Sequence, residues 1–265
     1  MRELLGRHGL SPDRSFGQNF LVDASVLDAI IAAAELDGDE TVVEFGPGLG
    51  ALTVALAGSA GKVRAVELDE RLLPVLAETT AGHANVTVVH QDALRFDYAS
   101  LEPDSMLVAN LPYNVATPLI RNSLESDRIS RLVVMVQKEV ADRLRADVGD
   151  SGYSALSLFT AHYADVRLVR HVQPGSFLPP PKVTSSVVRL DRRPGVQADP
   201  GLFRLIRSAF AHRRKTLRKN LIMSGYPEGT VLSALDTLQL DHLVRAEQVS
   251  PDGFRRLAAA LQRPD

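Results

Sequence analysis

The stretch that decides the fold of this chain is "TVVEFGPGLG", residues 41–50. Its first half is an apolar, β-branched run that predicts a buried strand, and its second half is a turn with three glycines. The apolar segment "ALTVALAG" (51–58) follows and predicts a short helix. Glycines between a strand and a helix let a ligand approach the backbone and the free N–H groups of the helix N-terminus. The stretch therefore predicts an α/β fold with a ligand-binding loop.

The segments that follow repeat this alternation of strand and helix. Strands are predicted at "KVRAVELD" (62–69), "VTVVHQD" (86–92), "SMLVANLP" (105–112) and "RLVVMVQ" (131–137), and helices at "ERLLPVLAETTA" (70–81), "PLIRNSLES" (118–126) and "KEVADRLRA" (138–146). Such alternation is typical of a parallel, Rossmann-like sheet. The strands "ADVRLVRHV" (164–172) and "KVTSSVVRLDR" (182–192) have no helix between them. We expect them to form an antiparallel pair at one edge of the sheet.

The composition changes after Pro194. The segment "RRPGVQADPG" (192–201) reads as a linker, and helices are predicted at 202–221, "GTVLSALDTLQL" (229–240) and "SPDGFRRLAAALQ" (250–262). In the last of these, Ser250 is expected as the N-cap and Pro251 as the first helical residue. We therefore expect a Rossmann-like domain at 1–193 and a small all-helical domain at 199–265.

Residue types that are missing exclude several kinds of chemistry. The 265-residue chain has no cysteine, which excludes disulfides, zinc knuckles and thiolate nucleophiles. Its seven histidines show no metal-ligand spacing, so no metal site is predicted. The start of the chain does not resemble a signal peptide, and no apolar run is long enough to cross a bilayer. A soluble, cytoplasmic monomer without a membrane partner is expected.

Charge is distributed unevenly along the chain. Residues 201–220 contain seven Lys or Arg and no Asp or Glu, so the rest of a chain of net charge −2 carries −9. On a helix spanning 202–221, most of these cations would lie opposite the apolar residues. A localised basic face on an acidic protein is typical of nucleic-acid binding, although a solvated helix face is the plainer alternative. The expected nucleic-acid contacts are Arg207, Arg213, Arg214, Lys215 and Arg218.

Two carboxylates follow the glycine loop at the ends of the next strands. Glu67 lies 21 residues beyond Gly46, where a carboxylate can accept hydrogen bonds from both hydroxyls of a ribose. Asp92 ends the third strand, where it can accept from the amine of an adenine. Together with the loop, these residues resemble the cofactor site of S-adenosylmethionine-dependent methyltransferases. The loop has the spacing G-x-G-x-G, so a dinucleotide-dependent dehydrogenase is a minor alternative, as are simple turn residues.

The stretch "NLPY" (110–113) ends the fourth strand. It resembles the [DNS]-P-P-[YFW] signature of enzymes that methylate exocyclic amines of bases, with Leu111 in place of the first Pro as in the rRNA adenine subgroup. The Asn110 side-chain oxygen and the Leu111 carbonyl can accept the two N–H groups of an amine and direct its lone pair at a methyl group. Pro112 fixes the loop, and Tyr113 offers a face for an extruded base. Asn114 is interpreted as a turn residue.

The wider sequence resembles the bacterial small-subunit (16S) rRNA adenine N6,N6-dimethyltransferase family over residues 10–262. The motifs are "FGQNFLVD" (16–23), "VEFGPGLGALT" (43–53), "VELD" (66–69), "QDAL" (91–94), "NLPYN" (110–114), "PGSFLPPPKVTSSVVRL" (174–190) and "AFAHRRKTLRKNL" (209–221). The resemblance implies that two methyls are placed on each of two adjacent adenines near the 3′ end of 16S rRNA. The implied partner is the 30S subunit or its precursor, late in assembly.

The same resemblance assigns individual residues. Around S-adenosyl-L-methionine it places Asn19, Leu21, Gly46, Glu67, Asp92 and Asn110. Phe177 becomes a second aromatic wall for the flipped adenine, opposite Tyr113, unless it is simply a core residue. Two alternative functions stay open: a large-subunit rRNA adenine dimethyltransferase of the erythromycin-resistance type, and a ribosome-assembly factor without catalysis.

Overall fold

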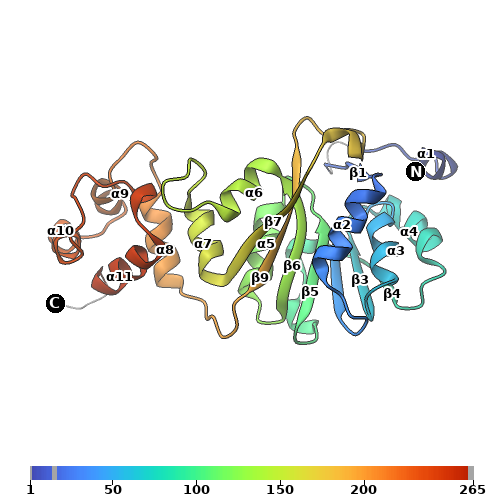
Figure 1. Ribbon diagram of the computed structural model, residues 1–265, viewed down its shortest axis with the longest axis horizontal. Coiled ribbons are helices and arrows are strands. Elements are labelled where there is room, and N and C mark those ends of the chain that lie inside the picture. Colours follow the sequence, from blue (N-terminus) through green and yellow to red (C-terminus); the bar gives the residue numbers. More distant parts are fainter. Residues whose placement is uncertain (1, 14–16, 262–265) are drawn as a thin grey trace. The chain divides into compact units, whose positions relative to one another are not determined.

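A computed structural model describes residues 2–13 and 17–261 (Figure 1). The chain divides into two compact units. The first consists of Met1–Ala141 with Ala164–Pro194, and the second of Asp142–Tyr163 with Gly195–Asp265. The segment 142–163 therefore groups with the helical residues, whereas the boundaries predicted from sequence placed it in the Rossmann-like domain.

The first unit is built on a seven-stranded sheet in the order β4-β3-β2-β5-β6-β9-β7. In Figure 1 the strands run from β4 on the right to β9 and β7 near the middle. Their bounds are β2 (Thr41–Phe45), β3 (Lys62–Glu67), β4 (Val86–His90), β5 (Ser105–Asn110), β6 (Ile129–Gln137), β7 (Ala164–Val172) and β9 (Ser185–Arg192). The strands β2 to β6 pair in parallel, and β9 is antiparallel to both β6 and β7. The predicted parallel sheet with an antiparallel edge is confirmed.

Helices pack on this sheet through apolar side chains. They are α2 (Ala24–Ala34), α3 (Ala51–Ala57), α4 (Leu73–Thr80) and α5 (Ala116–Glu125). The helix α6 (Lys138–Arg145) follows β6 directly, and the boundary between the two units falls within it. One core cluster joins Val26 and Ile30 of α2 and Leu56 of α3 to Val42 and Val108 in the sheet, all of them fully buried. The continuous apolar runs of the central strands are explained by this burial, because strands of parallel sheets are covered on both faces.

A second, two-stranded sheet was not predicted. It pairs β1 (Phe20–Leu21) with β8 (Phe177–Leu178) in antiparallel register, so that residues 156 and 158 positions apart in sequence lie side by side. The helix α1 (Arg2–Arg7) precedes it. Single 3-10 turns follow several strands: η1 (Glu70–Leu72), η2 (Ala93–Arg95), η3 (Tyr98–Ser100) and η4 (Pro174–Ser176). An aspartate side chain caps each of the first three, which fixes the backbone where the strands end.

The second unit is helical. It contains α7 (Ala155–Tyr163), α8 (Pro200–Ala209), α9 (Leu217–Met223), α10 (Glu228–Thr237), the turn η5 (Ala246–Gln248) and α11 (Pro251–Leu261). Phe159 and Tyr163 of α7 pack on Phe203 of α8, with ring centroids 5.0 and 5.7 Å from it. These aromatic contacts explain why the segment 142–163 belongs to this unit. Ser250 caps α11 as predicted, accepting from the Gly253 N–H at 3.0 Å.

The predicted helix over 202–221 is wrong in one respect, because the chain breaks into α8 and α9. Thr216 caps α9, accepting from the Lys219 N–H at 3.3 Å. The Asn220 side chain donates to the carbonyl of Ala209, the last residue of α8, at 2.6 Å and to that of His212 in the following turn at 3.2 Å. The basic residues therefore lie on a helix, a turn and a second helix, and do not form one stripe. No helix in the described part of the chain is long and apolar enough to span a membrane.

Candidate active site

The candidate site lies where the strand order of the sheet reverses. The chain leaves β2 towards β3 on one side and leaves β5 towards β6 on the other, so the carboxyl ends of the neighbouring strands β2 and β5 form a switch point. Open α/β sheets bind ligands at such a switch point. A cavity of about 280 Å³ opens there. Its walls include nine of the residues singled out from sequence: Asn19, Leu21, Gly46, Glu67, Asp92, Asn110, Leu111, Pro112 and Tyr113.

The glycine loop is held closely between two other segments. Gly46 and Gly48 have positive φ angles of 70° and 60°. A Cβ on Gly46 would lie 3.3 Å from the Pro112 ring, and one on Gly48 would lie 2.9 Å from the Phe20 ring. The loop therefore has neither the backbone conformation nor the space for ordinary side chains. The glycine loop therefore packs against both the β1 segment and the "NLPY" loop at the cavity wall.

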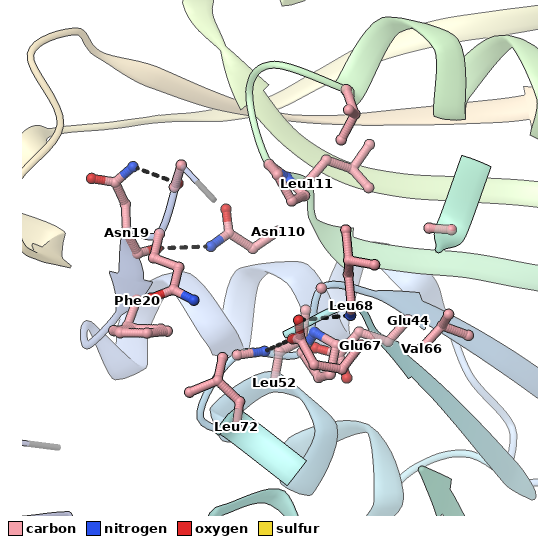
Figure 2. A pocket seen from close by; sticks show the side chains of 18 of the residues that line it. Asn19, Phe20, Glu44, Leu52, Val66, Glu67, Leu68, Leu72, Asn110 and Leu111 are labelled. Atoms are coloured by element: carbon pink, nitrogen blue, oxygen red, sulfur yellow. Dashed lines mark hydrogen bonds between the residues drawn. The ribbon is translucent and has the colours of Figure 1, made fainter. Parts of the chain in front are cut away.

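Glu67 fastens the same loop to the end of β3. Its Oε1 accepts hydrogen bonds from the N–H groups of Leu68 and Asp69, both at 2.8 Å, and its Oε2 accepts from Gly48 N–H at 3.2 Å (Figure 2). The side chain is buried, and this burial raises the pKa of the Glu67 carboxyl. Each carboxylate oxygen has two acceptor positions, so Oε2 keeps one for a ligand hydroxyl.

Asp92 and Asn19 stand at other parts of the wall. Asp92 caps η2 with one oxygen, accepting from the Leu94 N–H at 2.9 Å, and the residue remains half-exposed. Asn19 donates from its side-chain amide to the Gly17 carbonyl at 3.0 Å. Both side chains are thus oriented by backbone groups of their own segments, with further polar atoms available to a bound molecule.

The amide of Asn110 has a fixed orientation. Its Nδ2 donates to the backbone carbonyl of Asn19 at 3.2 Å, so its oxygen is turned away from Asn19 (Figure 2). The backbone N–H of the buried Leu111 donates to the Met135 carbonyl at 3.2 Å and anchors the loop to β6. Tyr113 is half-buried, and its hydroxyl is hydrogen-bonded to Ser185 Oγ. The loop thus presents the Asn110 amide oxygen together with the Tyr113 ring, whose hydroxyl is already hydrogen-bonded to Ser185.

Phe177 does not line this cavity. The side chain is 3% exposed and belongs to the core cluster of α2, α3 and the sheet. The β1–β8 pairing places Phe177 opposite Leu21, and both residues belong to this cluster. In this structure Phe177 is therefore a core residue, and its role as a second aromatic wall stays a prediction.

Two polar residues of the cavity were not assigned from sequence. Glu44 is 1% exposed at the end of β2 and accepts from Thr53 Oγ1 at 2.6 Å. Its burial raises the pKa of the carboxyl to about 8, so the neutral form prevails at pH 7. The Gln18 side chain donates to Asp69 Oδ2 and accepts from Asp13 N–H, both at 2.8 Å. The sequence signal for Glu44 was an acidic residue within a strand of apolar, β-branched residues. No comparable signal indicated the contacts of Gln18.

The five basic residues assigned to RNA binding lie in the second unit. Arg207 is exposed on α8, and Arg213, Arg214 and Lys215 are exposed on the turn between α8 and α9. Arg218 is half-buried and forms an ion pair with Glu228. Within residues 2–13 and 17–261, no group of three or more His, Cys, Asp or Glu side chains could hold a metal ion.

The parallel sheet, the glycine loop at its switch point and the carboxylates at successive strand ends define a class I methyltransferase. Solved structures agree with this class. A dimethyladenosine transferase from Plasmodium falciparum has a TM-score of 0.79 and 28% identity, covering 90% of this chain and 95% of that one. The 23S rRNA methyltransferase ErmE has a TM-score of 0.72 and 30% identity, and the match covers 92% of this chain and 100% of the ErmE chain.

Sequence comparison identifies the family. The model of the ribosomal RNA adenine dimethylases matches residues 10–263. Ribosomal RNA small subunit methyltransferase A of Deinococcus radiodurans is 47% identical, over 98% of this chain and 89% of the relative. That of Bacillus pumilus is 41% identical, over 99% and 95%. The chain belongs to the ribosomal RNA adenine dimethylase family and is an rRNA adenine N6,N6-dimethyltransferase. The predicted fold class and enzyme class are confirmed.

Proposed function

We propose that this enzyme transfers methyl groups from S-adenosyl-L-methionine to the N6 atoms of two adjacent adenines near the 3′ end of small-subunit rRNA. The substrate is the small subunit or its precursor. The relatives named as small subunit methyltransferases support this choice. The observation that carries the chemistry is the amide of Asn110, whose nitrogen is tied to Asn19 and whose oxygen is directed elsewhere within the cavity wall.

The residues of the cavity fit an adenosine-containing cofactor. Gly46 and Gly48 leave no room for side chains, so the backbone itself is available to the ligand. Glu67 keeps an acceptor for ribose hydroxyls, and Asp92 keeps one for an exocyclic amine. Leu21 is buried at the cavity and supplies an apolar contact. When bound, S-adenosyl-L-methionine supplies a methyl group that its sulfonium has already activated.

The "NLPY" loop would prepare the nucleophile. An aromatic amine reacts poorly because its lone pair is delocalised into the ring. Asn110 Oδ1 and the Leu111 carbonyl would each accept one N–H of the amine, which favours a more pyramidal nitrogen with an available lone pair. Tyr113 would hold the adenine ring by stacking, and alignment of the amine supplies much of the rate acceleration. Arg207, Arg213, Arg214, Lys215 and Arg218 would contact phosphates, which gives position and affinity rather than base recognition.

The deciding experiment uses ribosomal particles from cells that lack this protein. Incubation with the enzyme and labelled S-adenosyl-L-methionine should place N6,N6-dimethyladenosine in the 16S rRNA of 30S particles, located by mass spectrometry of nuclease fragments. Protein-free 23S rRNA serves as the competing substrate. Label in 23S rRNA alone would contradict the proposal and favour the erythromycin-resistance type. Cofactor binding is tested separately by thermal unfolding, where S-adenosylhomocysteine should raise the Tm and NAD should not.

A further inference from the structure

A second cavity lies within the helical unit. It measures about 370 Å³ and is formed by the turn between α8 and α9, the segment that precedes α7, and η5. Its walls include Tyr153, Phe210 and Asn220, together with the cations Arg213 and Lys215. Nothing in the mechanism proposed above uses its interior.

The polar group that defines this cavity is the side chain of Asn220. It is 1% exposed, and its Oδ1 is buried without a hydrogen-bond partner in the described part of the chain. Its Nδ2 donates to the carbonyls of Ala209 and His212. A rotated amide would bring its oxygen against those two carbonyls, so the orientation is fixed. Asn220 is one of the residues that line the cavity, and its buried acceptor is costly to leave without a donor.

The rest of the cavity wall consists of an aromatic part, formed by Tyr153 and Phe210, and a cationic part, formed by Arg213 and Lys215. The rings of Tyr153 and Phe210 meet edge to face, with centroids 6.3 Å apart. The Tyr153 hydroxyl already donates to the Val249 carbonyl at 2.9 Å, so the Tyr153 ring offers mainly apolar surface. Arg213 and Lys215 are exposed, and neither forms an ion pair with any residue that the structure describes.

Two carboxylates also line the cavity, and both have partners. Asp150 accepts from the Asp147 N–H at 2.9 Å, and Glu247 lies 3.7 Å from Arg245. Phe210 also stacks on Phe254, with ring centroids 6.0 Å apart, and it stays half-buried. The groups left for a ligand are therefore one acceptor, the rest of the Phe210 ring and two cations. An inorganic anion would satisfy only the cations. A nucleotide has an N–H donor on its base, a flat ring and a phosphate, and so matches all three.

We infer that this cavity holds one unpaired nucleotide of the RNA substrate. An N–H group of its base donates to Asn220 Oδ1, the ring lies against Phe210 and Tyr153, and the phosphate lies at Arg213 and Lys215. The inference rests on the proposed RNA substrate, and it adds a base-contacting site to a unit otherwise expected to contact only phosphates. Single-stranded RNA is recognised in this way, by stacking and by hydrogen bonds to base edges.

The first test measures binding of single nucleotides to the full chain. Saturating S-adenosylhomocysteine fills the cofactor cavity, and AMP, CMP, GMP and UMP are titrated while the Asn220 side-chain N–H₂ signals are followed by ¹⁵N–¹H NMR. At least one nucleotide should shift these signals. Where that nucleotide is AMP or CMP, its analogue without the exocyclic amine should bind about fivefold more weakly, as expected for one lost hydrogen bond. Ribose 5-phosphate is the control without a base. No shift with any nucleotide, or an equal shift with ribose 5-phosphate, would overturn the inference.

The second test blocks the cavity without touching the amide or the cations. Ser151 is exposed on the cavity wall, and Ser151→Trp should fill its mouth. The matched control is Ser233→Trp, at an exposed position of α10. The KM for 30S particles should rise about tenfold in Ser151→Trp with kcat unchanged, and both should stay at wild-type values in the control. Equal KM values for the two variants would contradict the inference.

The two proposals fail in distinguishable ways. If the wild-type enzyme does not methylate 30S particles, the proposed function is wrong and the nucleotide titration alone decides this cavity. If the wild type methylates them and Ser151→Trp does so with an unchanged KM, the proposed function stands and the nucleotide site is rejected. Thermal unfolding of both Trp variants shows that each is folded before these rates are compared.

Discussion

The cavity at the sheet edge and the cavity in the helical unit are built on opposite principles. In the first unit, Glu67 and Asn110 project from strand ends, and backbone groups hold both side chains in place. In the second unit, Arg213, Arg214 and Lys215 lie on an exposed turn between two helices. Methyl transfer depends on the alignment of a few atoms, which a sheet edge can provide. Holding a polyanion depends on charge, which tolerates a looser arrangement.

The strongest way to sharpen this comparison is Asn110→Ala. Loss of the amide oxygen should lower kcat about a thousandfold, because one fixed contact to the reacting group is removed. Affinity for 30S particles should stay within about twofold, since phosphate contacts provide most of it. Asn114→Ala is the matched control on the same loop, and its kcat should change by less than about threefold. A comparable loss of kcat in both variants would contradict the role assigned to Asn110.

The opposite result is expected when the basic turn is neutralised. Replacing Arg213, Arg214 and Lys215 by Ala should raise the Kd for 30S particles about a hundredfold, and lower the slope of log Kd against log salt by about two to three. The kcat at saturating substrate should be nearly unchanged. A filter-binding series over several salt concentrations measures both quantities. An unchanged slope would remove this turn from the RNA interface.

The tight fit of the glycine loop can be tested with Gly48→Ala. The new Cβ would lie 2.9 Å from the Phe20 ring at a φ of 60°, so the loop must shift. The affinity for S-adenosylhomocysteine, measured by calorimetry, should fall about thirtyfold. Gly82→Ala is the control, because no atom lies within 4 Å of its Cβ. Equal affinities in the two variants would show that the fit of the loop does not matter.

The smallest effect concerns Glu44 and stability. Burial raises the pKa of its carboxyl from 4.5 to about 8 in the folded chain. The folded state therefore binds more protons than the unfolded state between these values, and the free energy of unfolding falls as pH rises through this window. In urea titrations from pH 5 to pH 8, Glu44→Gln should reduce this fall by about 2 kcal/mol. Part of the fall should remain, since the pKa of Glu67 is raised as well. If the free energy of unfolding of Glu44→Gln decreased between pH 5 and pH 8 as much as that of the wild type, the pKa of Glu44 would not be raised in the folded chain.

Much of the cofactor cavity was predictable because its signals are local. The turn after β2, Glu67 after β3 and the loop after β5 each follow a strand that its own residues define. Parallel strands bring their carboxyl ends to one edge, so chain position alone predicts that these groups meet. The match to the adenine dimethylases confirms the enzyme class that these motifs indicated.

The features that differ from the expectations depend on contacts between distant residues. The burial of Phe177 follows from the pairing of β1 with β8, two short strands without a periodic pattern. The break between α8 and α9 depends on Asn220, which satisfies carbonyls up to eleven residues earlier in the chain. The helix α7 joins the second unit because its aromatic residues contact Phe203. None of these contacts can be predicted from the few residues that surround each position in the sequence.

The sequence by itself therefore determined the sheet, the strand-end groups and the family, because strand periodicity and turn chemistry act over a few residues. The tertiary structure alone decided which side of the Asn110 amide is available, that Glu44 is buried at the cavity, and that Asn220 has an acceptor without a donor. Hydrogen bonding and burial are properties of a side chain's whole environment, and in this chain that environment is assembled from residues far apart in sequence.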